Sequence, residues 1–189
     1  KVLGIPCEEV TKEQRSSAKA VNFGIVYGMG EYSLSQDLKI SVKQAKEYIE
    51  NYLDKYSGVK KYMEGIKEQA RRDGYVTTLM NRIRYIPEIS SSNYQTRSFG
   101  ERVALNTPVQ GTAADIIKLA MVRIYRRLKE EKLKSRLILQ VHDELIIETA
   151  NGEEAEVKKI LREEMENAMN LSVPLCVDMS EGRSWYDAK

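Results

Sequence analysis

The stretch RLILQVHDELIIETA, residues 136–150, decides the fold class of this 189-residue chain. Two apolar runs rich in β-branched residues flank a polar tip that contains His142, Asp143 and Glu144. Such runs, bounded by polar residues, predict antiparallel strands joined by a tight turn. The chain before this hairpin is mainly helical in pattern. We therefore expect an α+β fold, in which a helical lobe is followed by a lobe built on a small antiparallel sheet flanked by helices.

Capping signals place the first helices. Thr11 with Gln14, and Ser41 with Gln44, match the capping box, in which a hydroxyl and a side-chain amide satisfy the free donors of a helix start. The second helix is expected to run to about Lys55.

Breaker residues place the next two elements. Ser57 and Gly58 are expected to break the second helix, and a further helix should end at Gly74, a residue type favoured just after a helix. The segment YVTTLMNRIRYIP, residues 75–87, predicts a hairpin that turns at Met80–Asn81 and stops at Pro87.

The rest of the chain predicts two long helices and a last strand. A helix is expected from about Gln95, interrupted by Pro108, and another from Gly111 to about Lys134. The apolar face of the latter comprises Ile116, Ile117, Ala120, Ile124 and Leu128. An acidic helix at 153–170 and a closing strand at 173–179 are expected to complete the second lobe.

Composition indicates a globular protein, with 42% hydrophobic and 31% charged residues. No apolar run approaches the roughly 20 residues that span a bilayer, so we expect no membrane partner. The opening residue, Lys1, and the lack of a signal-peptide pattern indicate a fragment whose natural start lies upstream. Cys7 and Cys176 are too few for a disulfide framework and are expected to be small buried hydrophobes in a reducing cytoplasm.

Charge is distributed unevenly along the chain. Residues 1–140 carry 25 Lys and Arg against 16 Asp and Glu, whereas residues 141–189 carry 5 against 12. A basic body with interleaved aromatic residues is the electrostatic pattern of a phosphate-backbone binder. Solvated helix faces also produce such runs, so charge alone leaves both interpretations open.

The segment RSSAKAVNFGIVYG, residues 15–28, carries a cation-to-ring row: Arg15, Lys19, Phe23 and Tyr27. Each four-residue step along an α-helix advances about 400°, so these side chains share one face. Two cations followed by two aromatic rings suit a nucleoside triphosphate. An ordinary amphipathic helix remains the alternative, although glycines 24, 28 and 30, expected to interrupt this helix, favour close approach of a planar ligand.

Two further groups of residues carry candidate chemistry. The Asp143 carboxylate, held at a sheet edge, suits Mg²⁺, although Asp is also an ordinary turn residue. Arg102, Asn106 and Gln110 recur every fourth residue, and these residue types donate to base edges and minor-groove acceptors, although they could equally form a polar helix face.

Three motifs together resemble the carboxy-terminal half of a family A DNA polymerase, of the bacterial DNA polymerase I type. They are RSSAKAVNFGIVYG (15–28), RVALNTPVQGTAADIIKLAM (102–121) and LQVHDEL (139–145). The resemblance covers essentially the whole chain. It implies a fingers subdomain at 1–95 and a palm subdomain at 96–189. It also implies a cytoplasmic, nucleoid-associated protein active in DNA replication and repair.

The resemblance implies a role for each motif residue. Arg15 and Lys19 would hold the triphosphate of the incoming dNTP, Phe23 would pack on its sugar and base, and Tyr27 with Gly28 would shape the insertion pocket. The residues expected to contact primer-template DNA are Arg102, Asn106, Gln110, Gln140 and His142. Asp143 would bind the two catalytic Mg²⁺ ions, with Glu144 in support, and Lys19 would also assist catalysis.

Two departures from the family pattern qualify these expectations. A second metal-binding Asp, in a DYSQIE-like motif, and a DIH segment would lie upstream of Lys1, so residues 1–189 alone are expected not to polymerise and to need the upstream remainder of the polymerase. Ile83 stands where the family would have Arg. A non-catalytic nucleic-acid-binding module is the alternative function, whereas a P-loop NTPase is excluded because GxxxxGK[ST] is absent.

Overall fold

The computed structural model describes residues 6–188, apart from the side chains of residues 7, 13, 17 and 20. The chain forms two compact units, Lys1–Val109 and Gln110–Lys189. Helices with two small antiparallel hairpins make up these units, which confirms the predicted α+β class. The predicted fingers and palm boundary, at 95/96, divides the chain by function and stays a prediction.

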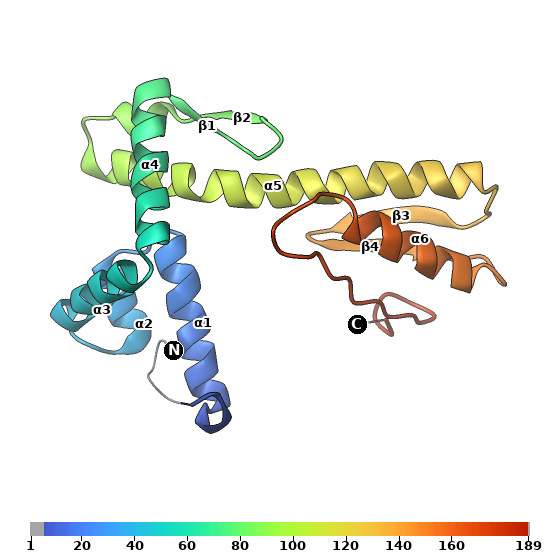
Figure 1. The fold of residues 1–189 in the computed structure, drawn as a ribbon, viewed down its shortest axis with the longest axis horizontal. Coiled ribbons are helices and arrows are strands. Elements are labelled where there is room, and N and C mark those ends of the chain that lie inside the picture. The colour runs from blue at the N-terminus through green and yellow to red at the C-terminus, as the bar shows by residue number, and fades with distance from the viewer. Residues whose placement is uncertain (1–5, 189) are drawn as a thin grey trace. The chain divides into compact units, whose positions relative to one another are not determined.

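The first unit contains most of the helices (Figure 1). Its elements, in chain order, are η1 (Cys7–Glu9), α1 (Lys12–Val26), α2 (Glu31–Leu38), α3 (Val42–Lys55), α4 (Ser57–Asp73), β1 (Tyr75–Thr77), β2 (Ile83–Tyr85), η2 (Pro87–Ser90) and the first part of α5 (Tyr94–Glu130).

Both predicted capping boxes are present. Thr11 Oγ1 accepts from the Gln14 N–H at 3.2 Å, and the Gln14 side chain accepts from the Thr11 N–H at 3.0 Å. Ser41 and Gln44 repeat this exchange at the start of α3, which ends at Lys55 as predicted. Each pair satisfies donors that a helix start otherwise leaves open.

Two expectations about helix interruptions were wrong. The break between α3 and α4 is the single residue Tyr56, while Ser57 and Gly58 lie inside α4. Gly28 and Gly30 lie outside α1, which ends at Val26, and Gly30 is the N-cap of α2. Of the three glycines, Gly24 alone lies within the helix, so the helix bears a smaller glycine penalty than the sequence suggested.

The predicted hairpin at 75–87 is confirmed. Tyr75 pairs with Tyr85 and Thr77 with Ile83, and Asn81 in the turn has a φ of 60°. Gly74 ends α4 in the left-handed conformation, as its position suggested. Ile83, which replaces the expected Arg, is 50% exposed on β2.

Two clusters of buried side chains form the interior of the first unit. Val21, Ile25, Leu34, Ala45 and Tyr52 join α1, α2 and α3. Tyr52 also donates a short hydrogen bond from its hydroxyl to Asn22 Oδ1, which ties α3 to α1. The second cluster joins α4, the β1–β2 hairpin, η2 and α5 through Ala70, Val76, Ile86, Ile89 and Ala104.

Helix α5 corrects the prediction of two separate helices. It runs without a break from Tyr94 to Glu130, with Pro108 inside, and ends before the expected Lys134. A proline in a helix interior costs about 3 kcal/mol. Ala104 and Leu105, which precede it by one turn, are 0% and 2% exposed. Burial of this part of the helix therefore outweighs the local penalty.

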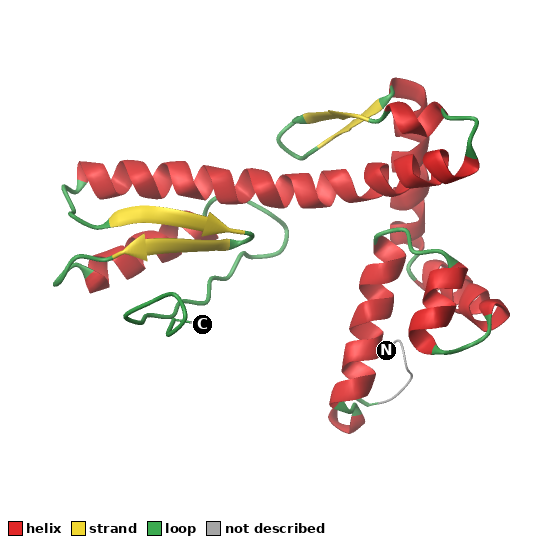
Figure 2. Cartoon of the chain, turned by 180° about the vertical axis from the view of Figure 1, so that it is seen from behind, coloured by secondary structure: helices red, strands yellow, loops and turns green. Residues whose placement is uncertain are grey.

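The second unit places a hairpin and a helix along the later part of α5. Strands β3 (Arg136–Val141) and β4 (Glu144–Glu148) form the predicted antiparallel pair, drawn as yellow arrows in Figure 2. Helix α6 (Glu154–Glu166) falls within the predicted acidic helix. Ala120, Ile124 and Leu128 pack with Val157 and Ile160, which confirms the predicted apolar face.

Two details of the second unit contradict the sequence expectations. Residues 173–179 form no strand, so the sheet there has two strands. Cys176 is exposed, whereas burial was expected. The side chain of Cys7, also expected to be buried, lies outside the described part of the chain.

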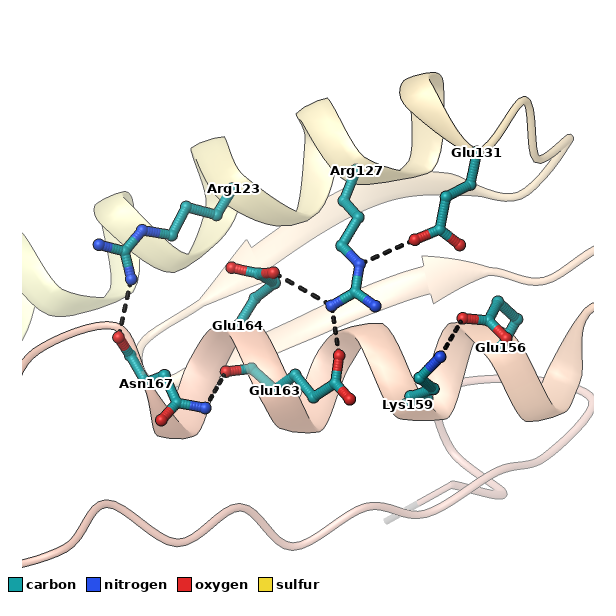
Figure 3. A network of polar contacts seen from close by, with 8 residues as sticks. All are labelled: Arg123, Arg127, Glu131, Glu156, Lys159, Glu163, Glu164 and Asn167. Carbon is teal, nitrogen blue, oxygen red and sulfur yellow. Dashed lines mark hydrogen bonds and ion pairs between the residues drawn. The ribbon is translucent and has the colours of Figure 1, made fainter.

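An ionic network links α5 to α6 in this unit (Figure 3). The Arg127 guanidinium contacts Glu131 at 2.8 Å, Glu163 at 2.5 Å and Glu164 at 3.2 Å. Hydrogen bonds to Glu131 and Glu163 raise the pKa of Arg127 above its ordinary value. Together with the apolar cluster, this network fixes the helix against which the β3–β4 hairpin packs.

Candidate functional site

The cation-to-ring row lies along one side of α1. The Lys19 Nζ is 5.8 Å from the centroid of the Phe23 ring, and the Phe23 and Tyr27 rings stack at 6.0 Å with 19° between their planes. Arg15 and Lys19 are exposed, and Phe23 is 46% exposed. The structure therefore brings Lys19, Phe23 and Tyr27 into one continuous row of contacts.

The other side of α1 fixes this orientation. Val21 and Ile25 are each 2% exposed in the cluster with α2 and α3, and Asn22 accepts from Tyr52. A helix that buries Val21 and Ile25 must direct residues 19 and 23 away from that cluster. An exposed aromatic ring beside an exposed cation provides a surface that suits a flat, anionic ligand.

Gly28 forms the turn that ends the row. The Gly28 N–H donates to the Ile25 carbonyl at 3.0 Å, and the Met29 N–H donates to the Gly24 carbonyl at 2.8 Å. This pattern is the Schellman motif, which needs a left-handed residue, and Gly28 has a φ of 80°. A methyl group at Gly28 would lie 2.9 Å from Leu105 Cδ1 and 3.3 Å from Arg102 Cγ. The predicted nucleotide helix and Arg102 thus meet at a glycine.

The three polar residues of α5 differ in their surroundings. Arg102 is exposed, and its guanidinium donates to Ser98 Oγ at 3.1 Å. Among the side chains that the structure describes, the Asn106 Oδ1 is the one buried polar atom that lacks a hydrogen-bond partner. Gln110 is exposed and begins the second unit. An unsatisfied buried oxygen costs free energy, so Asn106 is poorly explained by folding alone.

A two-residue turn carries Asp143 in the second unit. Val141 pairs with Glu144, so His142 and Asp143 alone connect β3 to β4. His142 has a φ of 53°, and its carbonyl accepts from Gln140 Nε2 at 2.6 Å. Hairpins this tight need a positive φ, which costs energy for residues other than Gly. The Gln140 side chain thus supports the peptide that immediately precedes Asp143.

The strand leading into this turn contains a β-bulge. Leu137 pairs with Ile147 and Leu139 with Ile146, which leaves Ile138 as the extra residue. A bulge reverses which face of the sheet each later side chain occupies. It therefore sets the direction of Gln140, two residues before the turn.

The turn provides carboxylate donors for a metal ion. Asp143 and Glu144 are both exposed, and Glu144 Oε2 accepts from the Trp185 indole N–H at 3.3 Å. In the part of the chain that the structure describes, no three His, Cys, Asp or Glu side chains gather as around a metal. The donor chemistry suits one or two ligands of a hard cation, and further oxygen ligands must come from elsewhere.

Sequence reasoning missed two residues, Asn22 and Trp185, and it assigned Gln140 to the DNA without its contact to the turn. Asn22 orients α1 through Tyr52, Gln140 supports the turn, and Trp185 contacts Glu144. The sequence separations for the first and third contacts are 30 and 41 residues, so no local pattern could reveal them. None of the helices in residues 6–188 combines the length and apolar character that a membrane span requires.

Comparison with known proteins gives consistent matches over the whole chain. The DNA polymerase I of Caldicellulosiruptor bescii is 53% identical over 188 residues, which cover 100% of this chain and 22% of that protein. The DNA polymerase I of Bacillus subtilis (strain 168) is 55% identical, with 100% and 21% covered. The chain therefore spans about a fifth of the length of these curated relatives.

A solved structure and a family model agree with these relatives. The POL domain of Pol1 from M. smegmatis, in complex with DNA primer-template and dNTP, matches with a TM-score of 0.94 and 48% identity. The match covers 99% of this chain and 33% of that one. The model of DNA polymerase family A matches residues 1–187. This chain belongs to DNA polymerase family A, as its three motifs predicted.

Proposed function

We propose that the chain is the fingers and palm portion of a DNA-directed DNA polymerase that extends a primer on a DNA template. The primer 3′-hydroxyl loses its proton to water, its oxygen forms a bond to the α-phosphorus of a dNTP, the bond from that phosphorus to the oxygen shared with the β-phosphate breaks, and pyrophosphate leaves. Family membership supports this reaction, and the M. smegmatis match is a complex with primer-template and dNTP.

The observation that carries the proposal is the row on α1. Lys19 lies 5.8 Å from the Phe23 ring centroid, and Phe23 stacks on Tyr27, with Lys19 and Phe23 exposed. Arg15 and Lys19 bind the triphosphate, where positive charge stabilises the negative charge that grows on the leaving phosphates. Phe23 packs on the sugar and base, and Tyr27 with Gly28 bounds the space left for the new base pair.

The polar residues of α5 and the β3–β4 turn act on the DNA. Arg102, Asn106 and Gln110 lie on α5, Gln140 lies on β3 just before the turn, and His142 is in the turn itself. Donors in the minor groove meet acceptors that all base pairs share, so they test the shape of a pair without reading its sequence. The Asn106 Oδ1 is buried and unpartnered, so the group of this side chain that would act on the DNA is its amide NH2 donor.

Magnesium is the metal that this donor set favours. Asp143 would hold Mg²⁺ as a direct ligand, with Glu144 beside it and the remaining ligands supplied by phosphate oxygens and by the upstream remainder of the polymerase. When bound, the metal ions neutralise charge on the reacting phosphate oxygens. The chain's own part is to hold the Asp143 carboxylate at a fixed place on a rigid hairpin.

The remaining assignments belong to the same proposal. The fingers comprise residues 1–95 and the palm residues 96–189, and both act together with the upstream remainder of the chain. The partners are primer-template DNA and dNTPs. The protein works in DNA replication and repair, in the bacterial cytoplasm at the nucleoid.

Primer extension by the full-length polymerase tests the proposal. The variant Asp143→Asn should lose about 10³-fold or more in single-nucleotide incorporation, since removal of a charged metal ligand abolishes transition-state stabilisation. Asp178→Asn, which changes an exposed carboxylate on the segment after α6, is the matched control and should retain the wild-type rate. Extension by Asp143→Asn at the wild-type rate would refute the assigned function.

A further inference from the structure

A loop in the second unit, residues 181–188, is closed tightly on itself. A methyl group at Gly182 would lie 2.7 Å from Asp187 Cβ and 2.9 Å from the Ala188 nitrogen. The Ser184 hydroxyl donates to Asp187 Oδ2 at 2.7 Å, and the Ser184 carbonyl accepts from the N–H groups of Asp187 and Ala188. Such close approach requires glycine, so the loop has a specific conformation.

Two contacts fix this loop to the rest of the unit. Glu181 forms an ion pair with Lys158 of α6 at 2.7 Å. At the other side, the Trp185 indole N–H donates to Glu144 Oε2 at 3.3 Å. The loop therefore bridges α6 and the turn that carries Asp143.

We propose that Trp185 is a positioning residue for Glu144 and, through it, for the metal-carrying turn. An exposed glutamate has three side-chain torsions and would otherwise sample many rotamers. The indole N–H is a donor on a large, rigid ring, and it accepts no hydrogen bond in return. Its contact restricts the Glu144 carboxylate to one orientation beside Asp143.

This role has a consequence for metal binding. A carboxylate that a hydrogen bond already holds in one orientation loses less conformational entropy when it binds a cation. Residues that hydrogen-bond to metal-ligating side chains commonly raise metal affinity for this reason. Loss of the indole N–H should therefore raise the concentration of metal that the enzyme needs. A loop that merely packs against the unit would affect stability alone. This inference rests on the proposed polymerase function.

The test uses the full-length polymerase with Trp185→Phe, which keeps an aromatic ring and removes the N–H. The matched control is Tyr186→Phe, because Tyr186 is the neighbouring aromatic residue, is 89% exposed and likewise loses one polar group. Two quantities are measured for each: the Mg²⁺ concentration for half-maximal incorporation, and Mn²⁺ binding to the enzyme–DNA complex without dNTP, by electron paramagnetic resonance.

Trp185→Phe should raise the metal requirement and the Mn²⁺ dissociation constant by about fivefold, the effect of losing one ordinary hydrogen bond at an exposed site. DNA affinity should not change. In the background of Glu144→Ala, Trp185→Phe should have no further effect. Gly182→Ala, which displaces the loop without changing Trp185, should reproduce the shift.

Three results would overturn the inference: a wild-type metal requirement in Trp185→Phe, an equal shift in Tyr186→Phe, or additive effects with Glu144→Ala. Each is distinct from failure of the proposed function. If the proposed function itself were wrong, the wild-type enzyme would not extend primers, or Asp143→Asn would extend them at the wild-type rate.

Discussion

Gly28, at the end of the predicted nucleotide helix, lies directly against Leu105 of α5. A methyl group at Gly28 would be 2.9 Å from Leu105 Cδ1, and Leu105 is 2% exposed. The same methyl would be 3.3 Å from Cγ of Arg102, a residue assigned to the DNA. Helices α1 and α5 are therefore joined at a position where only a hydrogen atom fits without strain.

Gly28→Ala should impair both functions together. The left-handed φ alone costs about 1–2 kcal/mol for Ala, and Leu105 or Arg102 must shift in addition. We expect a lower rate of dNTP incorporation and poorer discrimination between matched and mismatched primer ends. Gly65→Ala, inside α4 with open space around it, is the control and should not lower activity. Single-turnover extension measures both effects, and normal kinetics in Gly28→Ala would contradict the proposed coupling.

Lys19→Ala should weaken nucleotide use much more than DNA binding. Loss of a charged contact to phosphate corresponds to about 1.5–3 kcal/mol, so KM for dNTP should rise by about tenfold or more. Lys12→Ala, which removes an exposed cation from the first turn of the same helix, controls for net charge. Equal losses of dNTP and DNA affinity in Lys19→Ala would indicate that Lys19 is a cation for the DNA backbone only.

Local signals account for the parts of the fold that the sequence predicted. The capping boxes at Thr11 and Ser41 and the two hairpins depend on residues close together in the chain. The continuous helix through Pro108 could not be predicted this way. Its stability depends on burial of Ala104 and Leu105 by distant elements, and tertiary burial outweighs the local cost of proline.

The candidate site, like the fold, was predicted from the sequence only where it depends on residues close together in the chain. The four-residue spacing from Arg15 to Tyr27 predicted a shared face, and the contacts between Lys19, Phe23 and Tyr27 agree. The hydrogen bond from Trp185 to Glu144 joins residues 41 positions apart, and no sequence pattern near either residue predicts it. The strand expected at 173–179 fails because apolar residues alone do not supply a neighbouring strand to pair with.

Asn106→Leu should impair primer extension without lowering the free energy of unfolding. The Asn106 Oδ1 is buried without a partner, at a cost of about 1–3 kcal/mol, so the apolar replacement should not lower the free energy of unfolding. The same change removes the Asn106 amide donor and should weaken the extension of primer ends. Thr107→Val, which removes a hydroxyl that already donates to the Val103 carbonyl at 2.7 Å, should leave primer handling intact. Unimpaired extension by Asn106→Leu would contradict the assigned role.

Gln140→Met should loosen the turn that carries Asp143. The Gln140 amide donates to the His142 carbonyl at 2.6 Å and so holds a residue with a φ of 53°. Methionine has a similar length but no donor, so the amides of Val141 and Glu144, which pair beside the turn, should exchange with deuterium about fivefold faster. Metal requirement should rise more than the DNA dissociation constant, whereas a pure DNA contact would give the reverse. Gln36→Met, on the exposed side of α2, is the control.

Glu153 makes the stability of the second unit depend on pH. Hydrogen bonds from the Lys134 N–H at 3.0 Å and from the Ser135 hydroxyl at 2.6 Å lower the pKa of the Glu153 carboxyl. The Ser135 Oγ in turn accepts from the Ala150 N–H at 2.9 Å, so this carboxylate ties the start of β3 to the segment after β4. Sequence reasoning did not identify Glu153, because its partners lie 18 and 19 residues away.

Glu153→Gln should remove part of the acid sensitivity of the hairpin. A carboxyl whose pKa is lower in the folded protein contributes stability above its unfolded pKa, and this contribution is lost as pH falls through the folded pKa. The wild type should therefore lose more stability than Glu153→Gln between about pH 5 and pH 3. Deuterium exchange of the β3 and β4 amides measures the difference, with the exposed Glu130→Gln as control. Parallel pH profiles for wild type and Glu153→Gln would show that the carboxylate is not what secures the start of β3.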